Sequence, residues 1–225
     1  HNGLEKIASW RPDLIDGDFA ILMEPTDGRV EGGCQGTMRF TLEVPGRAAH
    51  SARSWIGHNA IHDLSAVLER LNRWQERDPF VEVDGLTFRE GLNATMLDAG
   101  VAGNVIPPTA TIQINYRFAP DKTTEQARQY MEDLFHEWPM NVLDLSAPAR
   151  PGLDRPLAKS FVAAVGGEPG PKYGWTDVAR FGQLGIPAVN FGPGNALCAH
   201  QVDECCRLGS LDECYRALHT WLASR

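Results

Sequence analysis

Several features that identify common classes of protein are missing from this sequence. No apolar run approaches the roughly 18 residues of a membrane-spanning helix, and no signal peptide opens the chain, so we expect no membrane partner. Basic residues are in deficit: 21 Lys and Arg stand against 29 Asp and Glu, for a formal net charge of −8. That balance argues against a nucleic-acid partner. No internal repeat or low-complexity tract is found.

Cysteine is scarce and irregularly spaced. The five cysteines are an odd number and include no Cys-x-x-Cys pair, which is unlike a disulfide framework, so a reducing cytoplasm is the expected compartment. A structural zinc knuckle is an alternative, drawn from Cys198, His200, Cys205, Cys206 and Cys214. Its spacing fits poorly, because two adjacent cysteines cannot easily both ligate one tetrahedral ion. Free thiols are the favoured interpretation.

What the sequence does contain is two short apolar segments, each followed by a candidate metal ligand. Residues 18–23 predict a buried strand that ends at Glu24; residues 188–191 predict another, after which a Gly-Pro-Gly turn leads to His200. In an open α/β sheet, ligands gather outside the carboxyl ends of the strands. A carboxylate and an imidazole that converge there suit Zn²⁺, which lowers the pKa of a bound water to about 7. At least one more ligand and a general base must come from elsewhere.

Between these segments the pattern is that of a small α+β domain. Alternating apolar residues predict strands over 37–44, 92–99 and 109–118, and a last strand at 142–145. One predicted helix is capped by Asn59 and carries an apolar stripe from Ile61 to Trp74; another begins at a Thr123–Gln126 capping box. The order strand, helix, strand, strand, helix, strand is that of a split βαβ sandwich.

The flanking residues have an α/β pattern. Helices are predicted over 4–10, 157–165, 178–184 and 211–222, the third capped by Thr176. The last is expected to bury Leu211, Tyr215, Leu218 and Leu222. We therefore predict an α/β domain over 1–35 and 148–225, interrupted by an inserted domain over 36–147. Because the chain opens on a helix with no strand before it, we also expect that an N-terminal portion of the α/β domain is missing.

Polar residues stand at unusual places in these elements. His50 lies in a loop bordered by Gly and Ala, Asn104 in a Gly-Asn turn, and Arg117 at the end of a strand. Each has a structural explanation by itself, but together they form a set of donors for an anionic substrate or an oxyanion. Arg180, one turn into the helix after Thr176, is a candidate for bidentate carboxylate binding.

Several short motifs, in order along the chain, resemble those of the dinuclear-zinc aminoacylase and carboxypeptidase family. They include Glu24-Pro25-Thr26, Ala49-His50-Ser51, Gly103-Asn104-Val105-Ile106-Pro107, Trp175-Thr176-Asp177 and Ala199-His200. The resemblance covers essentially the whole chain. It implies a zinc-exopeptidase-like α/β domain that binds two zinc ions, with cobalt as a possible substitute. It also implies a ferredoxin-like inserted domain that forms the homodimer interface and a lid.

The resemblance assigns roles to individual residues. Glu24 is similar to the carboxylate ligand of one zinc, and His200 to the histidine ligand of the other. His50 resembles the lid histidine that reaches the partner subunit's site and stabilises the oxyanion, and Asn104 resembles a lid residue donated in the same way. These are expectations from the family.

Substrate contacts follow from the same resemblance. Arg117, Thr176 and Arg180 match substrate-binding positions, the arginines facing carboxylates. The implied reaction is hydrolysis of the amide of N-succinyl-LL-2,6-diaminopimelate, with removal of an acetyl group from acetylornithine, or peptidase activity, as the alternative.

The sequence also departs from the family pattern. The family's His-x-Asp motif, bridging aspartate and Glu-Glu pair belong before Asn2-Gly3 and are absent, so this chain alone is expected to have no useful hydrolase activity. Arg53 replaces an aromatic residue, and Cys34-Gln35 stand where some relatives have basic residues. A non-catalytic, dimerising module therefore remains an alternative.

Overall fold

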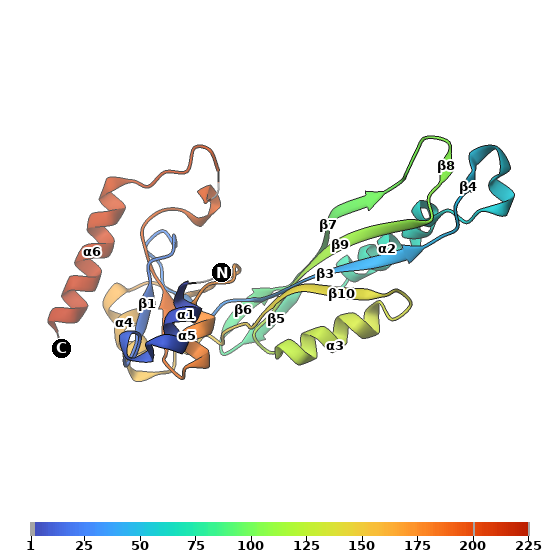
Figure 1. Ribbon diagram of the computed structural model, residues 1–225. Helices are drawn as coiled ribbons and strands as arrows, with labels where there is room; N and C mark the ends of the chain where they lie inside the picture. The colour runs from blue at the N-terminus through green and yellow to red at the C-terminus, as the bar shows by residue number, and fades with distance from the viewer. Residues whose placement is uncertain (1–2, 200, 225) are drawn as a thin grey trace. The chain divides into compact units, whose positions relative to one another are not determined.

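A computed structural model describes residues 3–199 and 201–224, and the chain divides into two compact units (Figure 1). Unit 1 comprises residues 1–35, Glu82–Phe88 and 148–225; unit 2 comprises Gly36–Val81 and Arg89–Ala147. The chain passes from unit 1 to unit 2 between residues 35 and 36 and returns between residues 147 and 148, and the short segment Glu82–Phe88 also belongs to unit 1. The predicted α/β fold with an inserted α+β domain is confirmed.

Unit 2 is built on one antiparallel sheet in the order β10-β3-β9-β7. Its strands are β3 (Gly36–Pro45), β7 (Gly91–Ala99), β9 (Thr109–Phe118) and β10 (Met140–Ser146). Alternate residues of β9 are buried, as the period of two predicts. The buried face packs against helices α2 (Ala60–Gln75) and α3 (Thr124–Leu134) in one core.

The helix starts of unit 2 follow their capping residues. The Asn59 side chain accepts a hydrogen bond from Ile61 N, and Thr123 and Gln126 form the predicted capping box. The apolar stripe of α2 was predicted too wide, since Ile61 and Leu68 are 42% and 44% exposed. Only the side chains that face the sheet are buried, because α2 meets a single flat layer on one side.

An arm extends from the ends of β3 and β9 (Figure 1). It consists of β4 (Ala49–His50), the 3₁₀ segment η2 (Ser51–Ile56) and β8 (Val105–Ile106), and β4 pairs with β8. Backbone hydrogen bonds close its base, where Arg47 N donates to His58 O and His58 N donates to Arg47 O. The arm is therefore an ordered extension of the sheet.

A hairpin that the sequence analysis missed joins α2 to β7. Its strands are β5 (Phe80–Val83) and β6 (Leu86–Arg89). The turn residues Asp84 and Gly85 both have positive φ, at 50° and 80°, as a two-residue hairpin turn of type I′ requires. The Asp-Gly pair was the available signal.

Unit 1 holds a small mixed sheet in the order β1-β12-β2-β11. Its strands are β1 (Ala20–Leu22), β2 (Glu31–Gly32), β11 (Gly170–Pro171) and β12 (Ala188–Asn190). β1 and β12 are parallel, whereas β12 and β2 are antiparallel. The two predicted strand ends are therefore neighbours at one edge of the sheet.

Helices surround this sheet. They are α1 (Gly3–Trp10), η1 (Pro12–Leu14), α4 (Pro156–Val165), α5 (Val178–Gln183), η3 (Ala196–Cys198) and α6 (Leu208–Ala223). No described helix is long and apolar enough to cross a membrane.

The buried face of α6 was predicted only in part, since Leu218 packs against the core of unit 1 as expected but the other three side chains do not. Leu211, Tyr215 and Leu222 are exposed, whereas Trp221 is buried. The Trp221 ring lies 5.1 Å from that of Phe161, and its indole N–H donates to Ser160 Oγ at 2.8 Å. Docking this largest side chain rotates the helix by about one residue from the orientation that a leucine stripe favours.

A buried carboxylate organises the polar interior of unit 2. The side chain of Glu90 is 2% exposed and forms ion pairs with Arg77 and Lys122. It also accepts hydrogen bonds from Tyr116 Oη and Ala119 N, at 3.1 and 3.0 Å. Burial, together with this adjacent carboxylate, raises the pKa of Tyr116 well above its ordinary value.

We expect Glu90→Ala to lower the free energy of unfolding by about 3–5 kcal/mol, because it leaves Arg77 and Lys122 without their buried partner. Urea unfolding followed by tryptophan fluorescence measures this loss. Glu69→Ala is the control, since Glu69 pairs with Arg73 on the exposed face of α2 and its removal leaves unfolding nearly unchanged. Equal effects of the two substitutions would contradict the assignment.

Candidate functional site

The ends of β1 and β12 are tied together by their turns. Leu22 lies opposite Asn190 in the parallel pair, and Phe191 N donates to Leu22 O at 2.8 Å. Beyond the strands, Gly192 N donates to Thr26 Oγ1 at 3.1 Å and Gly28 N donates to Gly192 O at 3.0 Å. The turn that follows Glu24 is thereby clamped to the turn that leads toward His200.

Gly192 is required for this close approach. A Cβ atom at position 192 would lie 2.6 Å from the carbonyl oxygen of Glu24 and 2.9 Å from Met23 C. Both are backbone atoms, so no side-chain movement could relieve the overlap. The two strand ends therefore meet backbone to backbone.

Glu24 presents a carboxylate at this edge. Its side chain is partly exposed, and it makes no hydrogen bond or ion pair with any residue that the structure describes. A hard, uncommitted carboxylate of this kind suits a divalent cation. His200 lies outside the described residues, so its approach to Glu24 stays a prediction.

The described residues do not form a complete metal site. Among residues 3–199 and 201–224, no group of three or more His, Cys, Asp or Glu side chains is placed to hold a metal ion. The alternative zinc knuckle gains no support from the described cysteines, which form no metal-binding group of three: Cys205 and Cys206 are exposed, whereas Cys214 is buried. Glu24 is compatible with a role as one ligand of a metal ion, and the described residues do not supply the other ligands.

Thr176 and Arg180 lie in unit 1 beside the start of α5. The prediction that Thr176 caps this helix is wrong, because Asp177 is the N-cap residue and makes no side-chain capping bond. The Thr176 hydroxyl is buried without a hydrogen-bond partner among the described residues. Arg180 donates to Asp177 Oδ1 at 3.0 Å and lies 3.4 Å from Glu5 Oε2, so its charge is already partly neutralised.

The sequence analysis missed a set of buried polar residues in and beside the sheet of unit 1. Asn190 is fully buried on β12, and its amide donates to Gly33 O at 3.1 Å. Lys172, 7% exposed, lies 2.9 Å from Glu31 Oε2. Asn190 was detectable as the one polar residue in an apolar strand, but nothing in the local sequence marks Lys172.

His50 and Asn104 are brought together on the arm of unit 2. β4 and β8 pair His50 with Val105, and Ser51 N donates to Asn104 O at 2.9 Å. Ala52 N donates to His50 Nδ1 at 3.1 Å. With Nδ1 acting as acceptor, a neutral His50 carries its proton on Nε2 and can donate from that atom.

Arg117 lies at the other end of the same sheet. It pairs with Thr37 near the start of β3, and its Nε donates to Asn115 Oδ1 at 3.1 Å. Burial lowers the pKa of its guanidinium, and the nearby charge of Asp144 opposes that shift. From Thr109 to Arg117 a strand advances about 27 Å, at about 3.4 Å per residue. Within one copy of unit 2, Arg117 is thus distant from the arm.

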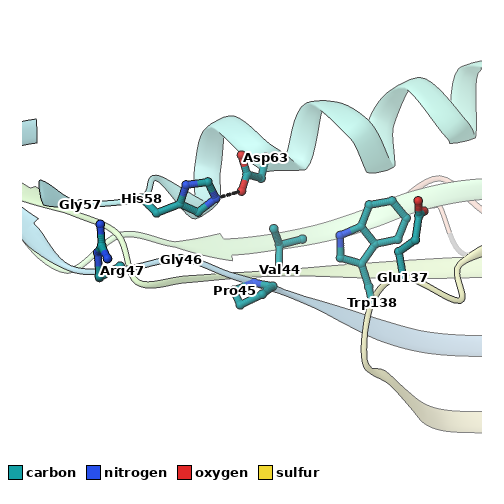
Figure 2. Close-up of a pocket in the computed structure, with 9 residues that line it drawn as sticks. All are labelled: Val44, Pro45, Gly46, Arg47, Gly57, His58, Asp63, Glu137 and Trp138. Atoms are coloured by element: carbon teal, nitrogen blue, oxygen red, sulfur yellow. Dashed lines mark hydrogen bonds and ion pairs between the residues drawn. The ribbon is translucent and has the colours of Figure 1, made fainter. Parts of the chain in front are cut away.

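A shallow groove of about 520 Å³ lies at the base of the arm (Figure 2). His58 points toward Asp63 at one end, and Glu137 and Trp138 lie at the other. The His58 and Asp63 side chains are bonded to each other, and Glu137 is paired with Arg70. Because neither carboxylate is free, this groove is not a candidate catalytic centre.

Known proteins share both the sequence and the fold. Residues 33–137 match the family described as the peptidase dimerisation domain. A Mycobacterium tuberculosis protein provisionally named succinyl-diaminopimelate desuccinylase is 50% identical over 98% of this chain and 62% of its own length. The Corynebacterium glutamicum succinyl-diaminopimelate desuccinylase is 39% identical over 99% of this chain and 61% of its own length. The chain thus spans about three fifths of these relatives.

Solved structures confirm the architecture at low sequence identity. A Staphylococcus aureus tripeptidase superposes with a TM-score of 0.73 at 19% identity, covering 97% of this chain and 60% of the other. An M20 family metallo-carboxypeptidase from Sulfolobus solfataricus gives 0.68 at 17% identity, covering 97% and 65%. These solved structures therefore share the fold of this chain, and residues 33–137 match the peptidase dimerisation domain.

Proposed function

We propose that this chain is part of a metal-dependent amidohydrolase that removes succinate from N-succinyl-LL-2,6-diaminopimelate. The observation that carries this proposal is the clamped pair of strand ends, which presents an uncommitted Glu24 carboxylate beside the turn toward His200. The identity to two desuccinylases over nearly the whole chain supports the choice of substrate.

In this proposal Glu24 and His200 each hold one of two zinc ions, with cobalt as a possible substitute, and residues outside this sequence complete the site. Bound zinc would supply a water of lowered pKa as the nucleophile. Thr176 and Arg180 are proposed to orient the substrate, and Arg117 is proposed as a further residue that binds a substrate carboxylate. A cytoplasmic location also stays a prediction, supported by the five free thiols.

The two donors on the arm act on a second copy of the chain. His50 carries an Nε2–H donor in its neutral form, and Asn104 lies in the turn before β8, where its carbonyl accepts from Ser51 N. Both are exposed at the opposite end of the sheet from Arg117. We propose that they stabilise the oxyanion in the partner's site, where fixed donors lower the barrier most.

The corresponding homodimer is proposed to form through α2 and β7. β7 is an edge strand of the sheet, and Leu97 on it is 58% exposed. Leu68 on the adjacent helix α2 is 44% exposed. An unpaired, apolar strand edge beside an apolar helix face is a typical site for sheet extension between two copies.

Activity is tested with the protein extended to the length of its relatives. We expect it to hydrolyse N-succinyl-LL-2,6-diaminopimelate with a higher kcat/KM than acetylornithine, and to lose turnover on chelation. Glu24→Gln should lower kcat about 100-fold or more, because Lewis-acid catalysis contributes several kcal/mol and each ~1.4 kcal/mol is tenfold. The exposed Glu168→Gln is the control.

Turnover that survives metal removal would contradict the proposal. A preference for acetylornithine would instead support the alternative acyl substrate within the same family. The 225-residue chain alone is expected to be inactive, because the described residues hold no complete metal site.

Dimerisation is tested on the 225-residue chain by sedimentation equilibrium. We expect the double variant Leu68→Lys, Leu97→Lys to weaken self-association about 100-fold or more, because a two-fold interface loses the burial of four leucines at ~1.5 kcal/mol each. Leu143→Lys on β10, at the opposite edge of the sheet, is the matched control. Equal weakening by both would rule out the proposed face.

A further inference from the structure

Lys172 is an unusually placed cation. Of the charged residues that the structure describes, only Glu90, at 4% exposure, and Lys172, at 7%, are buried. Glu90 is explained by the polar interior of unit 2. Lys172 lies in unit 1, just after β11, and the reaction proposed above assigns it no role.

The side chain of Lys172 spans the end of the sheet. Its backbone is held beside β2, because Lys172 N donates to Gly32 O and Lys172 O accepts from Gln35 N. Its ammonium lies 2.9 Å from Glu31 Oε2 and donates to Pro25 O at 3.4 Å. In the order β1-β12-β2-β11, a residue from one edge thus reaches the turn that follows the strand at the other.

Two buried side-chain oxygen atoms on the strands β2 and β12 lack a hydrogen-bond partner among the described residues. One is Asn190 Oδ1 on β12. The other is Glu31 Oε2 on β2, whose contact with Lys172 is an ion pair. Asn190 and Glu31 are also direct partners in the pairing of β12 with β2. The buried Lys172 ammonium therefore contacts two acceptors, the Glu31 carboxylate on β2 and the Pro25 carbonyl after β1.

Stability alone is a poor explanation for this arrangement. Removing a lysine and a carboxylate from water costs about as much as their attraction returns, so a buried ion pair contributes little net stability. The geometry of the Lys172–Glu31 pair, in contrast, is specific. It places the Lys172 ammonium at the carbonyl of Pro25, the residue that follows Glu24. The contact with Pro25 points to a local role.

We propose that Lys172 is a positioning residue for Glu24: its ammonium, held by Glu31, fixes the Pro25 carbonyl and so the direction in which the Glu24 carboxylate points. The metal-binding consequence rests on the function proposed above. The backbone conformation at Glu24 and Pro25 explains why the contact between Lys172 and the Pro25 carbonyl can have this effect. Proline fixes φ at position 25 and confines Glu24 to extended ψ, so anchoring the Pro25 carbonyl removes the main remaining freedom of this turn.

Hydrogen exchange on the 225-residue chain tests the positioning directly. The reporters are the amides of Asp27 and Gly28, which donate to Gly194 O and Gly192 O at 2.7 and 3.0 Å. The variant Lys172→Met, Glu31→Gln removes both charges and leaves no unpaired buried ion. We expect it to speed exchange of these two amides about ten- to hundredfold, the effect of losing a hydrogen bond from a charged donor.

Two further variants separate positioning from a general effect on the fold. Lys172→Arg keeps a cation that can bond both acceptors and should restore most of the protection. Lys159→Met removes an exposed lysine of α4 and should change nothing. Unchanged exchange in the double variant overturns the proposal. So does an acceleration shared equally by all amides of unit 1, because Lys172 would then only stabilise the fold.

Zinc affinity of the full-length protein, measured by competition with a chromophoric chelator, tests the link to the metal. We expect the double variant to bind zinc about 10- to 100-fold more weakly, as for other groups that orient a metal ligand, with a similar thermal midpoint. Wild-type affinity in this variant overturns the link. If the wild-type protein itself binds no divalent metal, the proposed function fails, whereas the exchange result still decides whether Lys172 positions the turn.

Discussion

The parallel pairing of β1 with β12 is the constraint on which the candidate site depends. These two strands come from distant parts of the sequence, and both are only three residues long. Their alignment is secured beyond the strands, where Thr26 and Gly192 bond each other. A side chain at position 192 would collide with the backbone at Glu24, so the close approach of the two turns requires glycine. The position of the Glu24 carboxylate follows from this contact.

Unit 2 imposes a different constraint, which is the distance between its polar residues on the arm and Arg117. The arm holds His50 and Asn104 at one end of the sheet, and β9 carries Arg117 at the other. Strand geometry fixes that separation at about 27 Å or more, so these polar groups cannot act on one small substrate within a single copy of the unit. The proposed homodimer resolves this, because the arm of one copy would serve the site of another.

Much of the fold could be predicted from the sequence where a local signal was strong. The alternation in β9 and the capping residues Asn59 and Thr123 gave strand and helix positions correctly. Prediction failed where tertiary packing decided between similar local patterns, as in α6, whose orientation is set by Trp221. The role of Glu90 was hidden for the same reason, since its partners come from separate elements.

The candidate site was less predictable than the fold. Glu24 could be found because an apolar strand ends on it, but its partners in unit 1, including Lys172, are assembled only by the sheet. Thr176 was noticed for a capping role, but Asp177 occupies the N-cap position and its side chain makes no capping bond. A complete ligand set could not be derived at all, because one candidate ligand lies outside the described residues and others are expected outside this sequence.

Anomalous diffraction at the zinc edge, from crystals of the protein extended to the length of its relatives, tests the central claim most directly. The account predicts a metal peak about 2.0–2.2 Å from a carboxylate oxygen of Glu24, with a second peak about 3.5–4 Å away beside His200. A Glu24 carboxylate that is bonded only to protein groups, with metal bound elsewhere, would contradict it.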